Sequence, residues 1–94
     1  MSDFPFTEKK ISKNKYIRRF SSEVNESEMV WHRDREDRLV KIVESKGWKI
    51  QFDNKVPVEM KEGDCFFIEA YSWHRVIKGG GALVVEITKH SRTI

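Results

Sequence analysis

The chain has 94 residues, and its 18 Lys and Arg against 15 Asp and Glu leave a formal net charge of only +3. This length predicts one domain, and an aromatic content of 12% excludes a disordered chain, which lacks large apolar side chains to bury. The single cysteine excludes an internal disulfide and favours a reducing, cytoplasmic location. Because the sequence shows neither a signal-peptide pattern nor an apolar run of spanning length, we expect no membrane contact.

Basic residues dominate the start of the chain, where six of them stand against two acidic residues between positions 1 and 20. We interpret 1–15 as a partly ordered N-terminal arm of a single domain covering 1–94. Nucleic-acid binding is disfavoured, because no aromatic stacking platform or recognition helix accompanies these charges.

Short alternating or β-branched stretches, separated by turn residues, occupy the rest of the chain. Gly79–Gly81 is predicted to be a flexible hairpin between the last two strands rather than a phosphate loop, because no helix follows it. The pattern indicates an all-β barrel or sandwich. A barrel of this size buries little surface, so a homodimer is expected. The predicted strands are 16–20, 28–31, 38–44, 48–52, 56–60, 65–69, 74–78 and 83–88.

Two histidines, His32 and His74, lie in strand-like segments that are far apart in the chain. His32, Asp34 and Arg38 share the parity of Val40, so along an uninterrupted strand their side chains are expected to face the interior. A shift of one residue at 35–37 would instead turn His32 and Asp34 to the face opposite Arg38 and Val40. If the strands fold back on one another, His74 joins them there. Two imidazoles and one carboxylate form a ligand set suited to Fe(II), Mn(II), Ni(II) or Zn(II).

The stretch from Gly63 to His74 resembles the second motif of the cupin superfamily. That motif has Gly, five residues, Pro, one residue, Gly, two residues and a metal-binding His. Here Gly63 and His74 keep the spacing, while Glu69 and Tyr71 replace the usual Pro and Gly. Lys78 stands where Asn is frequent.

An earlier stretch resembles the first cupin motif, which supplies His, one residue, His, then Glu, and six residues later Gly. In this chain these positions hold His32, Asp34, Arg38 and Ser45, with Gly47 keeping the turn. The likeness spans roughly residues 28–88 and implies a small double-stranded β-helix, or jelly-roll, barrel. It does not define a function, because this fold hosts enzymes, binding proteins and regulators.

Arg38 stands where the family has a Glu ligand, and the interpretation of the pocket depends on where its side chain points. Inside the site its guanidinium would repel a divalent cation and pair bidentately with Asp34, and the pocket would then suit a carboxylate or phosphate. Alternatively, its guanidinium extends past the metal and binds an anionic substrate. Glu36 and Tyr71 are further candidates for ligand contact.

Taken together, the sequence predicts a small cupin-like barrel whose pocket holds a metal and binds or acts on a small molecule. Two alternatives stay open: a metal-free module for a small anion, and a non-catalytic dimeric scaffold. Enzymatic activity is left undecided. The predicted metal ligands are His32, Asp34 and His74.

Overall fold

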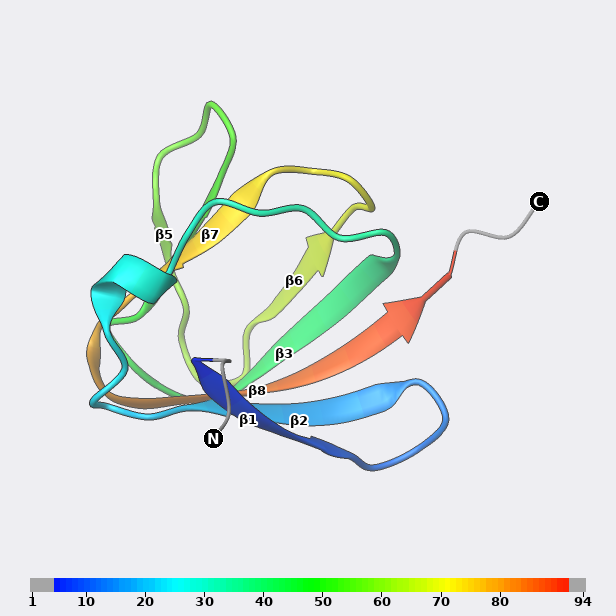
Figure 1. Cartoon of the computed structure of the whole chain (residues 1–94), viewed down its shortest axis with the longest axis horizontal. Coiled ribbons are helices and arrows are strands. Elements are labelled where there is room, and N and C mark those ends of the chain that lie inside the picture. The colour runs from blue at the N-terminus through cyan, green and yellow to red at the C-terminus, as the bar shows by residue number, and fades with distance from the viewer. Residues whose placement is uncertain (1–4, 92–94) are drawn as a thin grey trace.

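The computed structural model describes residues 5–91, which form two antiparallel sheets facing one interior (Figure 1). The larger sheet has the strand order β1-β2-β8-β3-β6 and the smaller one has the order β5-β4-β7. The predicted all-β jelly-roll architecture is confirmed. In the described part of the chain, no helix has the length and apolarity needed to cross a membrane. The strands are β1 (Phe6–Lys10), β2 (Lys15–Phe20), β3 (Asp37–Lys46), β4 (Lys49–Phe52), β5 (Val58–Glu59), β6 (Cys65–Ile68), β7 (His74–Ile77) and β8 (Gly80–His90).

The core lies between the sheets and is built from inward residues of β2, β3, β4, β6 and β8 together with Val24, Trp48 and Met60 from the connections. β8 is central, since it pairs with β2 on one side and β3 on the other. Its alternate residues Leu83, Val85 and Ile87 belong to the same buried cluster as Ile50 of β4 in the opposite sheet, as expected when successive residues of a strand point to opposite faces. The buried core cluster consists of Phe20, Val24, Val40, Ile42, Trp48, Ile50, Met60, Ile68, Leu83, Val85 and Ile87.

The chain passes from the smaller sheet to the larger one through Gly79. The predicted flexible hairpin at 79–81 is therefore wrong, because β7 and β8 belong to different sheets. A Cβ on Gly79 would overlap the carbonyl oxygen of Lys46 and the amide nitrogen of Trp48. The indole nitrogen of Trp48 donates to the carbonyls of Gly80 and Gly81, at 3.1 and 3.2 Å. This crossing is a close-packed contact that only glycine fits.

The predicted strand over 28–31 is wrong, because the chain forms a 3-10 turn, η1 (Glu26–Glu28), and then a segment without strand pairing. The side chain of Asn25 caps this turn by accepting a hydrogen bond from the amide of Ser27 at 3.0 Å. The apolar residues that follow resemble a strand in sequence, but the first paired position after the turn is His32.

Strand β1 lies within the region interpreted from the sequence as a partly ordered arm. It pairs with β2, beginning with Phe6 opposite Phe20. The two rings lie 5.4 Å apart, and Arg18 of β2 forms an ion pair with Glu8 of β1 at 2.7 Å. Residues 6–10 are thus held to the sheet by pairing, ring contact and charge. Residues 1–4 lie outside the described part.

Candidate metal centre

His32 and His74 are direct cross-strand partners. The amide of each donates to the carbonyl of the other at 2.9 Å, which forms an isolated antiparallel bridge. Directly opposed residues place their side chains on the same face, and the two rings lie 4.3 Å apart in an edge-on arrangement. Asp34, two residues beyond His32, shares that face. The predicted convergence is confirmed, because one candidate ligand atom from each of the three residues lies within 4.8 Å of the others.

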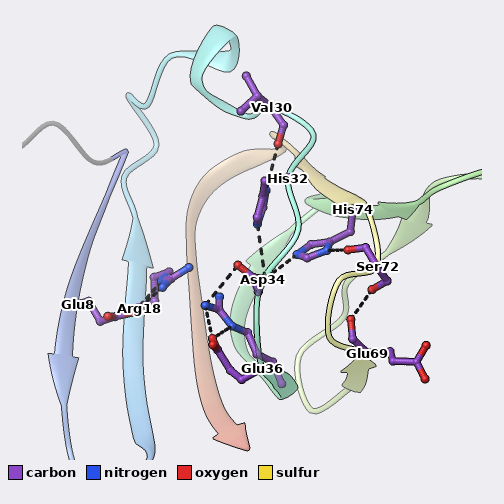
Figure 2. A network of polar contacts seen from close by, with 10 residues as sticks. Glu8, Arg18, Val30, His32, Asp34, Glu36, Glu69, Ser72 and His74 are labelled. Carbon is purple, nitrogen blue, oxygen red and sulfur yellow. Dashed lines mark hydrogen bonds and ion pairs between the residues drawn. The ribbon is translucent and has the colours of Figure 1, made fainter. Parts of the chain in front are cut away.

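Both imidazoles are oriented by backbone carbonyl groups (Figure 2). Nδ1 of His32 lies 3.1 Å from the carbonyl oxygen of Val30, and Nδ1 of His74 lies 2.9 Å from that of Ser72. A carbonyl can only accept, so each Nδ1 carries the proton, and in the neutral ring Nε2 presents its lone pair. Metal-binding histidines are typically oriented in this way.

The carboxylate of Asp34 faces both Nε2 atoms. Its Oδ2 lies 3.3 Å from Nε2 of His74 and 3.9 Å from Nε2 of His32. Oδ2 is buried without a hydrogen bond of regular geometry. Donor atoms about 2.1 Å from a shared ion stand roughly 3–4 Å apart, which matches these separations. A buried oxygen that faces two lone pairs fits a cation between the three atoms.

The protonation of two of these residues favours metal binding. Burial lowers the pKa of His32, although its contact with Val30 acts in the opposite direction. For Asp34, burial acts to raise the pKa, but His74, Arg38 and His32 together hold it below the ordinary value. A neutral imidazole and an ionised carboxylate are the forms that bind a metal.

Arg38 is restrained by Glu36. Its Nε and Nη2 both contact Oε1 of Glu36, at 2.8 and 2.7 Å. Nη2 also lies 3.3 Å from Oδ1 of Asp34, the carboxylate oxygen that does not face the histidines. The bidentate Asp34–Arg38 pair considered from the sequence is therefore not formed. Glu36 itself does not line the cavity.

A cavity of about 460 Å³ opens beside the three residues, with walls that are mainly apolar. Its charged lining consists of two acidic residues, Glu28 and Asp34, and two arginines, Arg38 and Arg18 of β2. From the sequence, Arg18 was recognised only as part of a basic region. A signal for Arg18 was present, because it shares its strand parity with Phe20, a core residue.

Tyr71 takes part in the site through its backbone alone. Its amide donates to the carbonyl of Asp34 at 2.7 Å, while its side chain is 57% exposed and outside the cavity lining. Its φ of 65° lies in the left-handed region, where glycine is the favoured residue. The cupin motif has its second Gly at this position, so the structure explains that preference.

No family model matches the sequence, and no curated protein matches it. Among solved structures, a putative mannose-6-phosphate isomerase from Ralstonia eutropha JMP134 is 23% identical with a TM-score of 0.64, covering 97% of this chain and 94% of that one. A cupin domain from Bordetella pertussis Tohama I is 19% identical with a TM-score of 0.61, covering 97% and 100%. FeII HppE is 11% identical with a TM-score of 0.65, and the match covers 81% of this chain but only 41% of HppE. At these identities the likeness shows the fold alone.

Proposed function

The chain has the cupin fold, and from that premise we propose that His32, Asp34 and His74 hold one divalent transition metal beside a small-molecule cavity. The observation that carries the proposal is Oδ2 of Asp34, a buried oxygen without a regular hydrogen bond that faces two imidazole nitrogens. Fe(II), Mn(II), Ni(II) and Zn(II) all accept two imidazoles and one carboxylate with positions left open. One structure of similar fold is named as an Fe(II) protein, which supports a metal in a barrel of this kind.

The exposure of the site supports access for a small molecule. The side chain of His74 is 4% exposed, whereas that of His32 is 43% exposed, so the site is open to solvent on the His32 side. A metal bound there would supply Lewis-acid or redox chemistry to a molecule in the cavity. The apolar walls of the cavity would exclude water from around that molecule, and Arg38, which contacts Asp34, would lie beside it.

Elemental analysis of protein purified without an affinity tag tests the proposal. We expect near-stoichiometric metal, either as purified or after reconstitution with Fe(II), Mn(II), Ni(II) or Zn(II) under anaerobic conditions. The variant His74→Ala should lose it, and His90→Ala is the matched control because His90 is exposed at the end of β8. Absence of metal after all four reconstitutions would contradict the proposal.

A metal-free anion-binding module is the second candidate, and the contact between Arg38 and Asp34 favours it. In that form no ion lies between Asp34 and the histidines, and the carboxylate contacts Arg38 at 3.3 Å and Nε2 of His74 at 3.3 Å. A protein that takes up no metal but is stabilised by small acids in a thermal-shift screen would support it.

The homodimer stays a prediction, which analytical ultracentrifugation checks.

A further inference from the structure

Arg18 is the second arginine that lines the cavity, and its hydrogen bonds use only the Nε and Nη2 edge of the guanidinium. Its side chain is 14% exposed, with Nε and Nη2 both bound to Oε1 of Glu8 at 2.8 and 2.7 Å. The guanidinium carbon lies 3.8 Å from the centre of the Phe6 ring. Among the described residues, Arg18 has no other hydrogen bond or ion pair. Nη1 therefore keeps two N–H donors for another partner.

Arg38, which lines the same cavity, repeats this arrangement, and its Nη2 also lies 3.3 Å from Oδ1 of Asp34. Its Nε and Nη2 share Oε1 of Glu36, just as Arg18 shares Oε1 of Glu8. In both residues the glutamate fixes the Nε edge and leaves the Nη1 end unused. Both arginines line the same cavity, and Figure 2 shows Arg18 extending from β2 toward the group around Asp34.

The charges of the two arginines act on one another. Burial lowers the pKa of Arg18, the contact with Glu8 opposes this, and the charge of Arg38 adds to the lowering. Stability alone is a weak explanation for two Arg–Glu ion pairs at this cavity, because apolar side chains of similar volume often stabilise the fold equally well. Each arginine is paired with a glutamate, and the cavity wall also holds Glu28 and Asp34, so an anion would be recognised through the unused Nη1 donors and not through an excess of positive charge.

We propose that Arg18 and Arg38 form an anion-binding subsite and that the cavity takes a small monocarboxylic acid with an apolar body. Guanidinium groups match the planar carboxylate geometrically. The mainly apolar lining, which includes Met29 and Leu83, accommodates the hydrocarbon part. The inference deepens the proposed function and rests on it for the cavity as a ligand site, but the subsite itself needs only the two arginines.

Hexanoate is the probe that tests the subsite, with hexanol as its neutral counterpart and hexyl phosphate as the second anion. Each is titrated into the full chain at pH 7, both metal-reconstituted and chelator-treated, and followed by amide chemical shifts. We expect saturable hexanoate binding at least about tenfold tighter than that of hexanol, since a charge-assisted hydrogen bond contributes a factor of this order. Tighter binding of hexyl phosphate than of hexanoate would overturn the carboxylate assignment.

Arg18→Gln and Arg38→Gln should each weaken hexanoate binding about tenfold or more and leave hexanol binding unchanged. Arg19→Gln is the matched control, because Arg19 is exposed on the opposite face of β2. If Arg18→Gln fails to fold, the double variant Glu8→Gln/Arg18→Gln removes both partners of the ion pair. Equal affinity for hexanoate and hexanol, or hexanoate binding insensitive to both arginine variants, would overturn the subsite.

Metal content is measured on the same samples, so the two proposals fail separately. Hexanoate binding that depends on the arginines in a protein without metal would retain the subsite and contradict the metal centre. Full metal occupancy without preference for hexanoate would retain the metal centre and contradict the subsite.

Discussion

The positive charge of Arg38 lies 3.3 Å from the carboxylate proposed to bind the metal, and Glu36 is the residue that restrains it. In Glu36→Gln the restraint loses its charge, so Arg38 is expected to move toward Asp34 and compete with the ion. Groups that orient metal ligands contribute about 10–100-fold in affinity, and we expect a loss within that range. Competition with a chelator of known affinity measures it.

The double variant Glu36→Gln/Arg38→Met separates this explanation from a general loosening of the site. Removing the competing cation should restore most of the affinity lost in Glu36→Gln, as a positive coupling in a double-mutant cycle. Unchanged affinity in Glu36→Gln, or no recovery in the double variant, would show that Arg38 does not control the metal site.

Gly79 gives a second prediction at the scale of single residues. Gly79→Ala should lower the free energy of unfolding by about 1–3 kcal/mol, because the added methyl group overlaps backbone atoms that cannot move aside cheaply. Gly80→Ala is the matched control, since its Cβ would meet its nearest neighbour at 3.8 Å, an ordinary contact. Urea unfolding measures both variants, and equal losses would contradict the close-packing explanation.

At the scale of elements, the connection between β6 and β7 positions His74. Its residue Ser72 supplies the carbonyl that orients the imidazole, and the amide of Ala70 donates to Oδ1 of Asp37 at 2.7 Å. Asp37→Ala should lower the free energy of unfolding by about 1–3 kcal/mol, because a buried amide loses a charged acceptor. We also expect severalfold weaker metal binding.

The exposed carboxylate of Asp53 provides the control for this connection. Asp53→Ala should change neither quantity appreciably when urea unfolding and metal titration are run in parallel. Lower stability in Asp37→Ala with unchanged metal affinity would show that the connection supports the fold but does not orient the histidine.

Strands with a buried apolar face could be predicted from sequence, and β3 and β4 are examples. β1 could not, because after Phe6 its residues are polar and exposed, so only pairing with β2 makes it a strand. The stretch at 28–31 was misleading, because apolar content alone does not show that the Asn25 cap starts a 3-10 turn first.

The residues of the candidate site also fall into those that could be predicted from sequence and those that could not. His32, Asp34 and His74 were predictable, because parity and motif spacing place them on one face. The bond between Glu36 and Arg38 was not, since it depends on side-chain conformations at the start of β3. Arg18 belongs to a strand remote in sequence from the motifs, and its role depends on how the sheets close around the cavity.

At the scale of the whole molecule, the proposed metal would connect the two sheets. Asp34 precedes β3 of the larger sheet, whereas His74 begins β7 of the smaller one. An ion held by both stabilises the folded chain through its preference for the assembled site. At free metal about 100 times the dissociation constant the gain is about 2.7 kcal/mol, which corresponds to a Tm rise of about 10–20 °C for a domain of this size.

Differential scanning calorimetry with and without added metal measures this rise in the wild-type chain and two variants. His74→Ala should abolish the rise, because it removes the ligand that β7 of the smaller sheet contributes to the described group. His90→Ala should retain it, since that residue lies at the end of β8 in the larger sheet. Metal binding to the unfolded chain lowers the Tm rise, but each histidine variant loses one histidine, so this loss is similar in both. The difference between them therefore reports the folded site, and an equal metal response in both would exclude a metal link between the sheets.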